Sequence, residues 1–224
     1  MNAREYCEAV ERKDRLQKQL IPTIPVKESN SPLISLKESG FNLIFEPCIK
    51  KDYKYLVRAE IVEKVGRISK LLDKEDKVLI IRSAWRSFEH QQLLWEYYFE
   101  MIRKEQPDKP IREIREIVSG FIAAKTKSMH ATGGAVDALI YDLKNDCIMD
   151  FGTNDGYKIE HNKECYPFHP GITPRAKENR KLLIDLFVNE DFVCDLKEYW
   201  HFDYGNVIWA IEKGEQYSIY GVVY

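Results

Sequence analysis

SMHATGGAVDALIYD, residues 128–142, joins a polar loop to an apolar strand in a chain of 224 residues. The second part of this stretch, 135–142, is rich in apolar and β-branched residues and predicts a buried strand. The pair Gly133-Gly134 lies between loop and strand, and glycine lets the backbone fold back there because it adopts conformations that other residues avoid. His130 and Asp137 can therefore converge near the start of the strand although they are seven positions apart.

On both sides of this stretch, hydrophobic spacing predicts helices and strands in alternation. Helices are expected over residues 2–20, 53–72, 88–104, 111–124 and 174–190, and further strands over 41–45, 77–81, 192–196 and 199–205. About thirty loop-rich residues follow the 135–142 strand, and a loop that long is uncommon in a compact domain unless it has a function. We therefore expect an α+β fold, with a small antiparallel sheet flanked by helices.

The domain organisation expected from composition is simple. Residues 1–35 read as a polar helix followed by an arm rich in Pro and Ser, and residues 36–224 as one compact domain. Hydrophobic residues make up 44% and charged residues 31%, as in an ordinary globular chain. The 34 Lys and Arg nearly balance the 36 Asp and Glu. This balance argues against a general nucleic-acid binder.

The compartment is expected from the first residues and the cysteines. MNAREYCEAVERKDRLQKQL (1–20) is charged throughout and lacks the apolar core of a signal peptide. No apolar run approaches the ~20 residues that cross a membrane. Five scattered cysteines without a CxxC pair suit free thiols in a reducing compartment. We expect a cytoplasmic protein that does not associate with membranes.

The residues most suited to chemistry are histidines and carboxylates around the 135–142 strand and the 199–205 strand. Hydrolytic zinc sites take three protein ligands from His and carboxylates and leave a position open for water. His130, Asp137 and His201 would meet that requirement, and Glu198, three positions before His201, could take a proton from the water. His-x6-Asp or Glu-x-x-His alone is more often structural. Considered together, the residues leave a metal site and a structural role both open.

A second group follows the 77–81 strand in RSAWRSFEH (82–90). Arg86 at a strand-to-helix junction could bind a carboxylate or stabilise an oxyanion, because its guanidinium donates two parallel hydrogen bonds. The alternative is that Arg86 or Arg82 forms a surface ion pair. Ser87 suits the N-cap of the next helix, and His90 then lies on the helix face.

Other features carry less chemistry. His161 and His169 fall in the long loop, where an exposed structural position is the simpler interpretation. The GxSxG, GxxxxGK[ST], HExxH and GxGxxG motifs are all missing, so the hydrolase, nucleotide-binding and zincin signatures they mark are not present.

The pattern SxHxxGxAVD (128–137), followed far downstream by ExWH (198–201), resembles the zinc D-Ala-D-Ala peptidases. This group includes VanX-type D-alanyl-D-alanine dipeptidases, D,D-carboxypeptidases and certain phage endolysins. The resemblance spans about residues 50–205, and it implies the zinc D-Ala-D-Ala peptidase (Hedgehog/DD-peptidase) fold. It also implies one Zn²⁺ per chain held by His130, Asp137 and His201, with Glu198 as general base and Arg86 stabilising the tetrahedral intermediate.

The resemblance also implies substrate-binding residues, and it divides between branches. Ser128 matches a serine that helps to hold the substrate in dipeptidases, and Asp155 is the nearest match to the acid that binds a free α-ammonium group. EYWHFDYGN (198–206), MDFGT (149–153) and NRKLLIDLFVNEDF (179–192) resemble dipeptidases. SAWRSFEHQQLLW (83–95) and HATGGAVD (130–137) are closer to carboxypeptidases and endolysins.

The function expected from these observations is zinc-dependent hydrolysis of D-alanyl-D-alanine to two D-alanines, with a small D-amino-acid peptide as the partner molecule. Two alternatives remain open. One is a D,D-carboxypeptidase or endolysin-like muropeptide peptidase of the same family. The other is a catalytically silent zinc-containing binding module. The sequence leaves the oligomeric state open.

Overall fold

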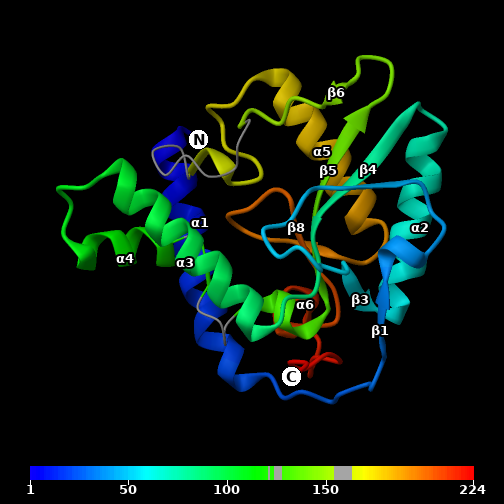
Figure 1. The fold of residues 1–224 in the computed structure, drawn as a ribbon, viewed down its shortest axis with the longest axis horizontal. Coiled ribbons are helices and arrows are strands. Elements are labelled where there is room, and N and C mark those ends of the chain that lie inside the picture. The colour runs from blue at the N-terminus through cyan, green and yellow to red at the C-terminus, as the bar shows by residue number, and fades with distance from the viewer. Residues whose placement is uncertain (121, 124–127, 154–162) are drawn as a thin grey trace.

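The computed structural model describes residues 1–120, 122–123, 128–153 and 163–224 (Figure 1). Its α-helices are α1 (Ala3–Leu20), α2 (Ala59–Asp73), α3 (Phe88–Glu105), α4 (Ile111–Ser119), α5 (Pro174–Val188) and α6 (Val207–Lys213). Its strands are β1 (Leu33–Ser35), β2 (Leu43–Phe45), β3 (Leu56–Arg58), β4 (Lys77–Ser83), β5 (Ala135–Asp142), β6 (Cys147–Ile148), β7 (Val193–Cys194) and β8 (His201–Asp203). Short 3-10 turns are η1 (Ile21–Thr23), η2 (Leu36–Glu38) and η3 (Met129–Thr132). In the described residues, no helix is both long and apolar enough to span a membrane.

The main sheet is mixed. Its strand order is β2-β4-β5-β8-β7, with β6 paired to β5. The β4–β5, β5–β6, β5–β8 and β7–β8 pairs are antiparallel, whereas β2 and β4 are parallel. The expected antiparallel sheet is therefore wrong for the β2–β4 pair. The reason is that α2 lies between these strands in sequence, and a helical crossover returns the chain in the same direction.

Apolar side chains on one face of the main sheet belong to the hydrophobic core. Successive side chains of a strand point to opposite faces. On β5, Val136 and Ala138 are buried in the core cluster, and on β8 the ring of Phe202 stacks on Phe187 of α5 with centroids 3.9 Å apart. Asp137 and His201 alternate with these core residues, so they share the opposite face of the sheet.

Helices α2 and α5 cover the core face, while α3 and α4 form a separate hairpin. Arg67 of α2 pairs with Glu190 just after α5 at 2.7 Å. The α3–α4 hairpin extends to the left in Figure 1 and packs around a small cluster of its own. That cluster consists of Ile102, Ile114, Val118 and Ile122.

The N-terminal residues pack against the C-terminal half of the chain. In α1, Lys13 pairs with Glu212 of α6, and Asp14 pairs with Lys197 at 2.6 Å. After α1 the chain passes the C-terminal segment, where Lys27 N–H donates to the Ser218 carbonyl at 2.9 Å. Strand β1 then pairs with β3 in a second, two-stranded sheet.

The helices expected from sequence are present, with differences at their ends. The expected helix 53–72 begins only at Ala59, because β3 precedes it and pairs with β1. The expected helix 111–124 ends at Ser119. Strands β1 and β6 and helix α6 were not expected, and β1 pairs before the predicted start of the compact domain. Very short strands and a seven-residue helix leave too little periodicity for a sequence pattern to reveal.

Candidate metal centre

The register of the main sheet places two of the three candidate ligands side by side. Asp137 on β5 lies directly opposite His201 on β8, and on its other side it pairs with Ser83 of β4. His201 Nδ1 is 2.9 Å from Asp137 Oδ1. Two of the three candidate ligands are thus neighbours because adjacent strands align them.

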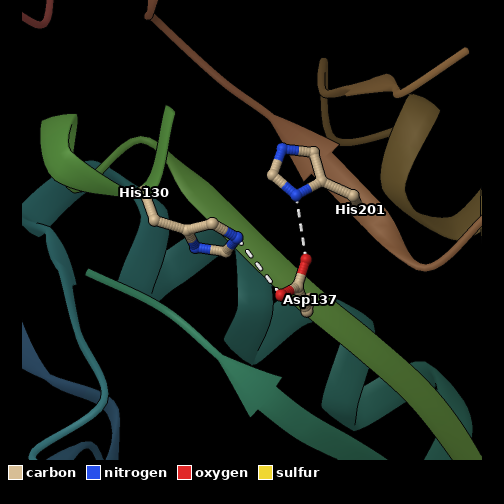
Figure 2. Close-up of side chains that lie close together, drawn as sticks. All are labelled: His130, Asp137 and His201. Atoms are coloured by element: carbon tan, nitrogen blue, oxygen red, sulfur yellow. Dashed lines mark hydrogen bonds and ion pairs between the residues drawn. The ribbon is translucent and has the colours of Figure 1, made fainter. Parts of the chain in front are cut away.

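The third candidate, His130, comes from the short turn η3 that precedes β5. Its Nε2 lies 3.1 Å from Asp137 Oδ2 (Figure 2). Gly133 ends the turn in the left-handed conformation (φ 72°), and a Cβ on Gly134 would lie 2.4 Å from the Tyr204 carbonyl oxygen. The glycine pair therefore permits both the reversal of the chain and its close approach to Tyr204, the residue that follows β8.

His130, Asp137 and His201 form a compact and buried group. One ligand atom from each lies within 4.8 Å of the other two, and all three residues are buried. The outer nitrogen of each ring is engaged elsewhere. His130 Nδ1–H donates to the Ala84 carbonyl at 2.7 Å, and His201 Nε2 lies 3.2 Å from Asp203 Oδ1. The remaining nitrogens, His130 Nε2 and His201 Nδ1, both face Asp137, as Figure 2 shows.

The charges of this group suit a cation. Burial lowers the pKa of His130 to about 4, and Arg86 adds to this effect, so the ring is neutral and offers a lone pair. Burial raises the pKa of Asp137, but the two histidines outweigh it and bring the pKa well below the ordinary value. Burial lowers the pKa of His201, yet Asp203 and Asp137 raise it well above the ordinary value. The site therefore favours positive charge.

The donor set fits a zinc ion. Two imidazole nitrogens and one carboxylate are the ligands that catalytic zinc sites use, with a position left for water or substrate. In such sites, the outer nitrogen of a ligating histidine donates to a carbonyl or a carboxylate. Both arrangements occur here, one at each histidine.

Arg86 lies at this centre, just after β4. Its Nη2 donates to Asp137 Oδ2 at 2.8 Å and its Nε to Ser83 Oγ at 2.7 Å. Its backbone N–H donates to the His130 carbonyl at 3.2 Å. Arg82 instead pairs with Glu46, Nε to Oε2 at 2.5 Å, which is the ion pair that the sequence left open.

Glu198 lies in the turn between β7 and β8 and is partly buried. Its carbonyl accepts from His201 N–H at 3.1 Å, and its own N–H donates to Asp195 Oδ1 at 3.0 Å. Burial raises the pKa of Glu198 to about 8, and the negative charges of Asp195 and Asp137 act in the same direction. A carboxylate with raised proton affinity beside a metal centre is suited to exchange protons near neutral pH.

The other residues considered from sequence lie in varied surroundings. Ser128 is buried immediately before η3. Ser87 caps α3, as expected, by accepting from the His90 N–H at 3.2 Å, and His90 is buried on that helix. His169 is buried rather than exposed, and its Nδ1 accepts from the Gly171 N–H. Asp155 and His161 lie outside the described residues.

Sequence reasoning did not identify Asp195 and Asp203 beside this centre. Asp203 lies two positions after His201, so strand alternation alone would place both side chains on one face. Asp195 lies three positions before Glu198 and accepts from the backbone of the turn that carries it, including Lys197 N–H at 2.7 Å. That Asx-turn pattern was readable from sequence, but nothing in it distinguishes a turn at an active site from an ordinary one.

The fold and the centre together define an α+β protein with a buried His/Asp/His group on one face of its sheet that could hold a metal ion. The chain belongs to the family described as VanY: D-alanyl-D-alanine carboxypeptidase, whose model matches residues 54–178, more than half of the chain. The expected kinship with the zinc D-Ala-D-Ala peptidases is thereby confirmed. The matched segment contains His130 and Asp137 and ends before Glu198 and His201.

Two individual proteins illustrate the relationship. The chain is 24% identical over 170 residues to the D-alanyl-D-alanine dipeptidase of Escherichia coli (strain K12), covering 76% of this chain and 77% of that protein. Its fold is similar to that of a mutant of the vancomycin resistance D,D-pentapeptidase VanY in complex with Zn(II). This second likeness has a TM-score of 0.50 and 14% identity over 86% of this chain and 90% of the other. It supports the expected α+β fold.

Proposed function

We propose that the protein is a zinc-dependent peptidase that hydrolyses the free dipeptide D-alanyl-D-alanine to two D-alanines. The buried group of His130, Asp137 and His201 carries this proposal, because its donors and its charge suit one catalytic zinc ion per chain. Membership of a D-alanyl-D-alanine peptidase family supports the substrate class.

The choice of the free dipeptide over a longer peptide rests on one relative. The E. coli relative is named a dipeptidase and aligns over three quarters of both chains. The family description, in contrast, names a carboxypeptidase, which favours D,D-carboxypeptidase activity on a longer peptide as the second candidate. The two activities differ in whether the substrate has a free α-ammonium group, and Asp155 is our proposed partner for that group.

The zinc ion, when bound, lowers the pKa of water toward ~7 and polarises the scissile carbonyl. The protein side chains supply the remaining steps. Glu198 accepts a proton from the attacking water and delivers it to the leaving amine, which its raised proton affinity favours. Arg86, fixed by Ser83 and Asp137, faces the negative charge that develops on the carbonyl oxygen. Ser128 helps to hold the substrate.

The test compares D-alanine release from free D-Ala-D-Ala with release from its N-acetylated form, using zinc-loaded protein. The dipeptidase proposal predicts release from the free dipeptide alone. Release only from the acetylated form would replace it with the carboxypeptidase. If the protein binds zinc tightly but releases no D-alanine from either form, and does not cleave murein fragments, the silent binding module would be favoured.

A further inference from the structure

The outer nitrogen of His201 faces a second buried carboxylate, Asp203. Its side chain is 1% exposed, and its Oδ1 lies 3.2 Å from His201 Nε2. The two residues lie two positions apart on β8, so they share the face of the sheet that also carries Asp137. His201 thus lies between two carboxylates, with Nδ1 toward Asp137 and Nε2 toward Asp203.

Asp203 is held in place from a second side. Asn206, fully buried, donates from Nδ2 to Asp203 Oδ1 at 2.6 Å. The Asn206 Oδ1 accepts from the N–H groups of Ile208 and Trp209 and so caps α6. The orientation of the Asp203 carboxylate therefore depends on Asn206 at the start of α6 as well as on His201.

Among the described residues, few groups offset the charge of Asp203. His201 is its only ion-pair partner among the described residues, and its Oδ2 is buried without a hydrogen-bond partner there. A buried carboxylate is costly unless positive charge or hydrogen bonds offset it. An imidazole that donates to Asp203 while its other nitrogen binds a dication would supply that positive charge.

We propose that Asp203 is a positioning residue of the metal centre, which holds the Nε2–H tautomer of His201 and so directs the Nδ1 lone pair to the zinc ion. This inference rests on the zinc centre of the proposed function. It assigns the two histidines different outer partners, since His130 donates to the neutral carbonyl of Ala84 whereas His201 donates to a carboxylate. A carboxylate partner raises the basicity of the ligand. Loss of such partners weakens metal binding in zinc sites by roughly 10- to 100-fold.

The first experiment measures zinc affinity by competition with a chromophoric chelator, starting from metal-free protein. Asp203→Ala should weaken zinc binding roughly 10- to 100-fold. Asp203→Asn should lose less zinc affinity than Asp203→Ala, because the amide oxygen still accepts from Nε2–H. Some loss should remain, because the negative charge is removed. Glu190→Gln, which changes a carboxylate paired with Arg67 beside α2, is the matched control and should bind zinc like the unmodified protein.

The second experiment reads the tautomer directly. In ¹⁵N-histidine-labelled protein loaded with ¹¹³Cd, the metal should couple to Nδ1 of His201 and to Nε2 of His130. In Asp203→Ala the coupling to His201 Nδ1 should weaken or divide between both nitrogens. A purely structural role would leave this pattern unchanged in any variant that still folds.

The outcomes separate this inference from the metal centre itself. Unchanged zinc affinity and unchanged Nδ1 coupling in folded Asp203→Ala would overturn the role of Asp203. If the alanine variant does not fold, unchanged zinc affinity in Asp203→Asn would overturn it. Coordination of His201 through Nε2 would also overturn it. Unmodified protein that fails to bind zinc, or His201→Ala that binds it normally, would instead remove the proposed centre.

Discussion

At the candidate metal centre, the charge of one side chain changes the proton affinity of its neighbour. Asp195 accepts two backbone N–H groups of the turn that carries Glu198, and its charge adds to the burial that raises the pKa of Glu198. One short turn thus both orients the proposed base and makes it a better proton acceptor.

The first prediction concerns Glu198. Glu198→Ala should keep zinc bound but lower turnover by roughly 10²–10⁴-fold, because proton transfer by a positioned side chain contributes about that much. Glu215→Ala, which changes an exposed glutamate after α6, should turn over normally. Initial rates and metal content measured on the same samples provide the check, and a normal rate in Glu198→Ala would exclude it as the base.

The second prediction concerns His130. His130→Ala should lose most of its zinc after dialysis, since one of the three proposed ligands and its lone pair are removed. His169→Ala is the control, because His169 is also buried but contacts Gly171 and Tyr6. Elemental analysis gives zinc per chain, and full occupancy in His130→Ala would remove this residue from the ligand set.

The sequence predicted the candidate ligands more completely than it predicted the residues that surround them. His130, Asp137 and His201 were predicted as a group, and the structure brings them together. Asp203 and Asp195 were not considered, because a carboxylate near a histidine in sequence carries no sign of whether it is buried or what it contacts.

At the scale of the elements, β8 determines where His201 and Asp203 lie. This three-residue strand is attached to the core through Phe202, whose ring stacks on Phe187 of α5. Sequence alternation predicted a strand here. It could not predict that β8 lies beside β5, because the order of strands depends on packing across residues far apart in the chain.

The third prediction tests this attachment. Phe202→Ala should lower the free energy of unfolding by about 3–5 kcal/mol, as expected when a fully buried ring is removed from a core. Zinc affinity should fall as well, because β8 carries His201, one of the proposed ligands. Phe168→Ala is the control, since Phe168 is 58% exposed and should change stability by less than about 0.5 kcal/mol. Urea unfolding of the metal-free proteins measures the stability of both variants, and competition with a chelator measures their zinc affinity. Equal stability of Phe202→Ala and the unmodified protein would contradict this account of β8.

For the whole molecule, the notable feature is how the N-terminal segment packs on the body. The sequence predicted a helix and an arm before the compact domain, and α1 and the extended residues after it are present. Their contacts with Lys197, α6 and the C-terminal segment join residues nearly 200 positions apart. No sequence pattern predicts such contacts, since single ion pairs leave no periodicity.

The fourth prediction is a pH dependence of stability from this packing. Burial raises the pKa of Asp14, but Lys197 and Lys18 outweigh it and hold the pKa below its ordinary value. The unfolded chain therefore takes up the proton first, so the stabilisation is present above the ordinary pKa and is lost as the pH falls through the folded value. Asp14→Asn should lower the free energy of unfolding by less than about 1 kcal/mol at pH 7. Its melting temperature should fall less steeply than that of the unmodified protein as the pH falls below about 4. Parallel melting curves would contradict the role of this pair.

The central claim is that hydrolysis depends on zinc at His130, Asp137 and His201. The most direct measurement is titration of metal-free protein with zinc while D-alanine release from D-Ala-D-Ala is recorded. The account predicts that activity rises in proportion to bound zinc and levels off at one ion per chain. Activity in metal-free protein, or full occupancy of the three-residue site without release from any D-Ala-D-Ala peptide, would contradict it.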